Sequence, residues 1–185
     1  MNEAAWILGI IFCSLGVVLC TKAGFGLSMI AAVPYIIHVK MINFFSWYSQ
    51  GTSEYIWQGI LLLIMCLAIK KFKWKYLLSF AAAVIFGFAV DFWLKVIGGG
   101  AIYATIPARI AAFIAGEVFT ALAIAFYFRT DMPLEMYELV VVEIADTYKL
   151  DKNKVKFVND AAMLILSVIL ALTLNKSFKG LGSEL

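Results

Sequence analysis

Long apolar runs, separated by short polar or glycine-containing segments, dominate the chain. Each of five runs approaches the ~20 residues that an α-helix needs to cross the hydrocarbon core of a bilayer. The predicted spans are Ala4–Thr21, Tyr55–Ile69, Tyr76–Ile97, Pro107–Phe128 and Phe157–Leu174. The fold class that this pattern indicates is an all-α membrane protein, a helical bundle forming a single transmembrane domain over residues 1–185.

Two further segments have a helical pattern that polar residues interrupt. Gly26–Tyr48 is broken by Pro34, His38 and Lys40, and Pro133–Tyr148 carries four acidic residues. Because a carboxylate is costly at the bilayer centre, we predict broken helices that are re-entrant or interfacial. The pattern leaves open whether Gly26–Tyr48 crosses the membrane.

A weak internal repeat relates the two halves of the chain, about 4–97 and about 107–179. With an offset of 107 residues, the matching pairs are Gly9 and Gly116, Phe12 and Phe119, Leu15 and Leu122, Lys22 and Arg129, Leu27 and Leu134, and Met29 and Met136. Further along, Gln58 falls opposite Asn159. Each half then has a spanning helix, one cation, a short break and a second helix.

Lysine-rich loops indicate the topology. Lys70–Lys75 and Lys149–Lys156 are both predicted to be cytoplasmic, since cytoplasmic loops carry an excess of basic residues. Both can lie inside only if two spans separate them, which favours a re-entrant or interfacial Pro133–Tyr148. Inverted repeats with broken helices are typical of transporters. The alternative is that Gly24, Gly26 and Pro133 mark tight loops between ordinary helices.

Composition supports a lipid environment and excludes several function classes. Hydrophobic residues make up 64% of the chain and charged residues 15%, so lipid must cover much of the apolar surface. A net charge of +3 is too small to indicate a nucleic-acid partner. The three cysteines have no metal-site or disulfide spacing, and no catalytic motif is present, so we expect neither a metal, a cofactor nor enzymatic activity.

Three short stretches carry a family resemblance: Leu15–Ser28, Ser49–Thr52 and Gly87–Trp93. In these stretches the chain resembles the YczE/YitT-like small bacterial membrane proteins. The resemblance implies a bacterial inner-membrane protein of transporter type, and little chemistry. Ser28-Met29-Ile30 replaces the Pro-Trp-Asp usual in that family. Family members, as the resemblance implies, continue after Gly180-Leu181-Gly182 with another span, so this chain is either truncated or naturally shorter.

Glu117 is the sharpest candidate for chemistry, because it lies near the middle of a predicted span among apolar and small residues. An ionised carboxylate there needs a cation, a polar cavity or a proton. A proton would suit a proton-coupled carrier. The alternative is a neutral glutamic acid that forms a hydrogen bond across the bundle.

Other candidates are polar residues in or beside the spans. Asp91 and Asp160 either bind substrate or pair with Lys95 and Lys156, each four residues away on a helix. Lys22 and Arg129 either cap helix carbonyls or hold an anionic substrate. The remaining candidates for substrate or proton binding are Gln58, Asn159, Asp131, Glu135 and Glu138.

Asp131, Glu135, Glu138 and Asp146 fall on one helical arc. This acidic stripe either attracts a cation or is a solvated face with lysine counter-charges.

Two functions are compatible with these features. The first is a small-molecule or cation transporter that binds its substrate near the broken helices and Glu117, in a polar cavity that reaches Glu117. The second is a non-catalytic substrate-binding or scaffold subunit of a larger membrane complex. For the second, Ala108, Ala112 and Gly116 offer a small-residue face for close packing with a partner subunit or another copy of the chain.

Overall fold

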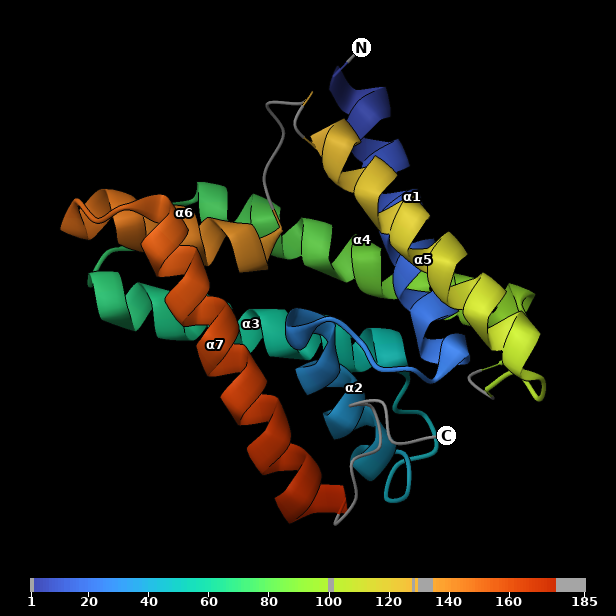
Figure 1. Ribbon diagram of the computed structural model, residues 1–185. Helices are drawn as coiled ribbons and strands as arrows, with labels where there is room; N and C mark the ends of the chain where they lie inside the picture. Colours follow the sequence, from blue (N-terminus) through green and yellow to red (C-terminus); the bar gives the residue numbers. More distant parts are fainter. Residues whose placement is uncertain (1, 100–101, 128, 130–134, 176–185) are drawn as a thin grey trace.

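The computed structural model describes residues 2–99, 102–127, 129 and 135–175, and every regular element within them is a helix (Figure 1). The helices are α1 (Asn2–Ala23), α2 (Met29–Met41), α3 (Gln50–Ile69), α4 (Lys75–Val96), α5 (Ile106–Tyr127), α6 (Met136–Tyr148) and α7 (Lys152–Leu170), which continues into a π-helical turn at Ala171–Asn175. Five of these, α1, α3, α4, α5 and α7, are long and apolar enough to cross a membrane. The predicted all-α membrane bundle is therefore confirmed.

α3 begins earlier than the sequence pattern predicted. The helix starts at Gln50 rather than Tyr55, because the hydroxyl of Ser49 accepts a hydrogen bond from the backbone N–H of Thr52 and so caps the first turn. Four polar side chains thereby join Gln58 in the helix, and we call the segment Gln50–Gln58, with its five polar side chains, the polar half of α3. The five are Gln50, Thr52, Ser53, Glu54 and Gln58, and all are buried.

α1 and α5 form an antiparallel pair at one side of the bundle (Figure 1). The ring of Phe12 lies 5.6 Å from that of Phe119 and 5.7 Å from that of Phe126. At the crossing point, a Cβ placed on Gly116 would lie only 2.9 Å from the carbonyl oxygen of Gly16. The small-residue face of α5 is therefore in part covered by α1 of the same chain.

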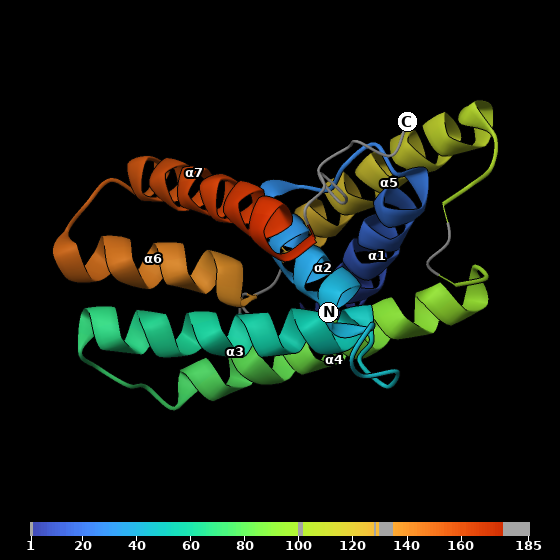
Figure 2. The same ribbon diagram turned by 90° about the horizontal axis from the view of Figure 1, so that it is seen from below.

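α3, α4 and α6 lie side by side at the other side of the bundle (Figure 2). Gly51 and Gly87 let α3 and α4 approach closely, because a Cβ on Gly87 would meet the carbonyl oxygen of Gly51 at 2.6 Å. Tyr137, Leu139, Val140 and Val141 of α6 are buried, and most of them join the core that α3 supplies. α6 is therefore a short helix packed within the bundle, and its re-entrant or interfacial position relative to the membrane stays a prediction.

α2 and α6 are matched in length and position. Each has 13 residues, and α6 begins and ends 107 residues after α2, which agrees with the offset of the predicted repeat. At ~1.5 Å per residue, neither is long enough to cross a membrane alone. α2 packs against α3 and α7, and α6 packs against the same two helices.

The lysine-rich segment between α3 and α4 and the one between α6 and α7 lie at the same end of the molecule, at the left of Figures 1 and 2. The hydroxyl of Tyr148 donates a hydrogen bond of 2.6 Å to the carbonyl of Ala68. The buried carboxylate of Glu143 lies 2.6 Å from the ammonium of Lys73 and 2.5 Å from that of Lys75. The two lysine-rich segments therefore lie together, and their cytoplasmic location stays a prediction.

The contacts of Glu143 determine its protonation. Desolvation raises the pKa of this carboxyl group, but hydrogen bonds from Lys73, Lys75 and Tyr76 outweigh it and lower the pKa to about 2. Because the folded-state value lies below the unfolded value of ~4.3, the stabilisation is complete above that value and is lost as the pH falls toward 2.

We expect Glu143→Gln to lower the free energy of unfolding by about 2 kcal/mol at pH 7, since charge-assisted hydrogen bonds to a buried group are lost. The difference from the native protein should shrink below pH ~4.3. Thermal unfolding in detergent across this pH range measures it. Asp146→Asn is the control, because its ion pair with Lys152 is exposed and should contribute less than about 1 kcal/mol. A pH-independent effect of Glu143→Gln would contradict this account.

Candidate functional site

The N-terminus of α3 is held by a carboxylate from α4. Asp91 accepts a hydrogen bond of 2.5 Å from the hydroxyl of Ser49 and one of 2.9 Å from the backbone N–H of Gly51. A negative charge is favourable at this place, because the free N–H groups of the first turn and the helix dipole both point toward it. Asp91 therefore fixes the end of α4 against the first turn of α3.

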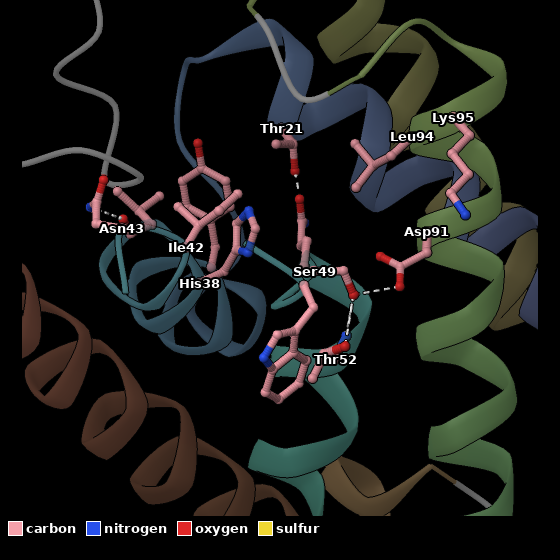
Figure 3. Close-up of a pocket in the computed structure, with 13 residues that line it drawn as sticks. Thr21, His38, Ile42, Asn43, Ser49, Thr52, Asp91, Leu94 and Lys95 are labelled. Carbon is pink, nitrogen blue, oxygen red and sulfur yellow. Dashed lines mark hydrogen bonds between the residues drawn. The ribbon is translucent and has the colours of Figure 1, made fainter. Parts of the chain in front are cut away.

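A pocket of about 730 Å³ opens beside this junction (Figure 3). Residues from α1, α2, α3, α4 and the segment before α3 surround it. They are Thr21, Tyr35, His38, Val39, Ile42, Asn43, Trp47, Ser49, Gln50, Thr52, Asp91, Leu94 and Lys95. The size falls in the range of small-molecule sites, and both an acid and a base line the walls.

The ion pair predicted between Asp91 and Lys95 is not formed. Among the described ion pairs, none joins Asp91 to Lys95, although the two residues are four positions apart on α4. Asp91 bonds to α3 instead, because the backbone and hydroxyl donors of the first turn are closer than the exposed ammonium of Lys95. Lys95 is thus a charged lining residue with no recorded ion pair.

Hydrogen bonds from neighbouring helices hold the polar lining of the pocket in place. The amide of Gln50 donates a hydrogen bond of 3.2 Å to the hydroxyl of Thr21 on α1. The hydroxyl of Ser53, directly after the lining residue Thr52, donates one of 2.5 Å to the carbonyl of Pro34 on α2. The Nδ1 atom of His38, which also lines the pocket, is buried and has no hydrogen-bond partner.

A second polar cluster lies deeper, where α3 meets the N-terminus of α6. The Oε2 atom of Glu54 accepts a hydrogen bond of 3.1 Å from the hydroxyl of Tyr137. The Oε1 atom of Gln58 accepts one of 3.4 Å from the backbone N–H of Met136, at the first residue of α6. Just before it, Glu135 accepts one of 2.7 Å from the hydroxyl of Tyr127, and burial raises the pKa of its carboxyl group. Two predicted site residues, Gln58 and Glu135, therefore meet here.

Sequence reasoning missed Glu54 and Arg109. Glu54 falls one residue before the predicted span that begins at Tyr55, although its position four residues before Gln58 places both on one helix face. Arg109 is buried near the start of α5, and its Nε atom donates a hydrogen bond of 2.7 Å to the carbonyl of Ala23, at the end of α1.

Lys22 has a structural partner. Its ammonium donates a hydrogen bond of 2.8 Å to the carbonyl of Gly99, beyond the end of α4, and lies 4.9 Å from the centre of the Tyr103 ring. This is the carbonyl-capping alternative of the two predicted roles. Arg129, its counterpart in the predicted repeat, is exposed.

Part of the predicted acidic stripe has lysine counter-charges, since Asp146 lies 3.3 Å from the ammonium of Lys152. Glu138 lies 2.9 Å from the ammonium of Lys156, which is also 3.9 Å from Asp160, the pair predicted from their spacing. Asn159 is half-buried beside them on α7, and Asp131 lies outside the described residues. Among the described residues, no group of three His, Cys, Asp or Glu side chains is arranged to hold a metal ion.

Glu117 lies on the exposed side of α5 and does not line the pocket between α2, α3 and α4. Its nearest recorded polar neighbour is the thiol of Cys20, 3.7 Å from Oε1. The polar cavity predicted to reach Glu117 therefore does not coincide with this pocket.

The model of a protein family of unknown function, DUF6198, matches residues 1–183. The chain belongs to this family. No curated protein and no solved structure matches it. The family match covers nearly the whole chain, including every helix and both polar clusters, and it assigns no chemistry to either.

We expect Asp91→Ala to lower the free energy of unfolding by about 1–2 kcal/mol, because it removes the acceptor of two hydrogen bonds at the start of α3. Lys95→Ala is the matched control, being one helical turn away with no recorded ion pair, and should change stability by less than about 0.5 kcal/mol. Thermal unfolding of the purified protein in detergent measures both. Equal losses for the two variants would instead support an ion pair between them.

Proposed function

We propose that the chain is a membrane transporter for a small polar molecule, and that the substrate binds in the pocket between α2, α3 and α4. The observation that carries this proposal is a pocket of about 730 Å³, lined by an acid, a base and a histidine, in a largely apolar bundle. Bundles in lipid rarely hold ionisable side chains unless these face a cavity or a partner. Here Asp91, Lys95 and His38 share one cavity.

The charges of the pocket indicate the substrate class. Asp91 offers a carboxylate that still has free lone pairs, and Lys95 offers an ammonium without a recorded ion pair. Thr21, Asn43 and Thr52 add neutral hydrogen-bonding groups. A small zwitterionic molecule complements both charges, and we propose this class within the broader one of small molecules and cations.

The short helices support a transport role. α2 and α6 are each too short to cross a membrane, and both begin at the same offset in the predicted repeat. α2 contributes several residues to the pocket. The N-terminal turn of α6 contacts the polar half of α3. Transporters commonly build their sites with discontinuous helices of this kind.

The proposal also includes the cellular location of the protein. We place the protein in a bacterial inner membrane, with the lysine-rich segments Lys70–Lys75 and Lys149–Lys156 in the cytoplasm, because basic residues mark the cytoplasmic side. The resemblance to YczE/YitT-like proteins supports the same setting. We propose no enzymatic activity, since the sequence contains no recognisable catalytic motif.

The alternative, a substrate-binding subunit of a larger complex, shares the pocket but needs a partner for transport. The small-residue face of α5 gives it less support than expected, since Gly116 already packs against α1. Outward-facing apolar residues of α5, such as Ile110, Ile114 and Val118, are exposed and can contact either lipid or a partner.

Uptake into proteoliposomes that contain only the purified chain tests the proposal. The probes are radiolabelled amino acids and betaines as zwitterions, with organic cations and organic anions for comparison. We expect uptake of a zwitterion, and at least a tenfold loss in Lys95→Gln, because the charge-assisted hydrogen bond to the substrate disappears. Glu117→Gln is the matched control, which removes one charge outside the pocket and should retain uptake.

Two results would contradict the proposal. Uptake that Glu117→Gln abolishes and Lys95→Gln preserves would place the site at Glu117. Uptake that appears only after a second membrane subunit or an ATPase is added would favour the subunit alternative.

A further inference from the structure

Glu54 lies at the centre of the bundle without a cation. Its side chain is 1% exposed, and one carboxyl oxygen, Oε2, accepts a hydrogen bond from Tyr137. The other oxygen, Oε1, is buried without a hydrogen-bond partner. None of the ion pairs formed by the described residues includes Glu54. An ionised carboxylate in such a place is strongly disfavoured unless a positive charge reaches it.

The groups around Glu54 determine which cation suits the site. Gln58 is fully buried, and its amide nitrogen has no hydrogen-bond partner. The indole nitrogen of Trp57 is likewise buried without a hydrogen-bond partner. Both are on the face of α3 that carries Glu54. These nitrogens are hydrogen-bond donors, as are the hydroxyl of Tyr137 and the N–H of Met136. A metal cation needs several oxygen ligands, whereas a proton needs one.

Other ionisable groups face the same site from three helices. Glu135, just before α6, acts electrostatically on Glu54, and both carboxyl groups act on the thiol of Cys13 in α1; Tyr127 of α5 donates a hydrogen bond to Glu135. Two carboxyl groups within reach of each other resist ionising together. The N-terminus of α6 adds a partial positive charge beside them, which keeps an ionised state accessible. The pair can thus hold or release one proton.

We propose that Glu54 is a proton-binding site of the membrane domain, which takes up one proton from water on its Oε1 atom and is neutral in the resting protein. A role in transport rests on the proposed function: there, this site would supply the coupling proton. Gln50, which lines the pocket, precedes Glu54 by four residues, so the two sites are about 6 Å apart along α3. A change of charge at Glu54 therefore acts within one helical turn of the substrate.

Infrared spectroscopy of the purified chain in lipid tests the proton site directly. A protonated carboxylic acid gives a C=O stretching band that a carboxylate lacks. We expect this band in the native protein at pH 7, a loss of its intensity in Glu54→Gln, and full intensity in Glu117→Gln and Glu138→Gln. Tyr137→Phe keeps the carboxyl group and removes one hydrogen bond, so the band should persist and shift to higher frequency. This variant covers the case in which Glu54→Gln fails to fold.

A band that survives unchanged in Glu54→Gln, or that is insensitive to Tyr137→Phe, would overturn the proton site. The coupling is tested separately with the proteoliposomes, by measuring uptake with and without a pH gradient across the vesicle membrane. The gradient should change the uptake rate of the native protein at least fivefold and leave that of Glu54→Gln unchanged. Gradient-independent uptake with the band present would overturn the coupling alone. The absence of any uptake would count against the transport function, and the infrared band would still decide the proton site.

Discussion

Burial of the polar half of α3 is the constraint on which the other helices depend. Five polar side chains enter an apolar bundle there, and each must find a partner, since lipid offers none. The partners come from different helices: Thr21 on α1, Pro34 on α2, and Tyr137 with Met136 on α6. Asp91 of α4 binds the same helix at its first turn. Satisfying α3 therefore fixes the positions of four neighbours at once.

The same constraint separates two sites along one helix. Near the start of α3, the partners leave space, and Asp91, Lys95 and His38 line a pocket that water can enter. One turn further, Glu54 and Gln58 keep buried atoms that the surrounding protein does not satisfy. The proposed function assigns the substrate to the first site, and the further inference assigns a proton to the second. Their closeness gives a physical route by which one can influence the other.

Hydrophobic runs were sufficient to predict the spanning helices, because lipid selects for long apolar segments. They could not locate the start of α3, since the polar residues from Gln50 to Glu54 read as a loop until tertiary partners are known. Candidate residues fared unevenly for the same reason. Gln58 and Glu135 meet in the bundle, whereas Asp91 bonds to α3 and Glu117 faces outward. Helical spacing within one segment cannot show which face of that helix another helix covers.

Cysteine cross-linking between α3 and α6 tests the central claim most directly. In a variant without Cys13, Cys20 and Cys66, cysteines replace Gln58 and Met136, whose side-chain and backbone atoms are in contact. Mild oxidation in lipid should join them rapidly, while a control pair at Gln58 and Ile144, two turns further along α6, should stay reduced. If the first pair stays reduced and reacts with a membrane-impermeant maleimide, the polar half of α3 is not buried against α6, and the account fails.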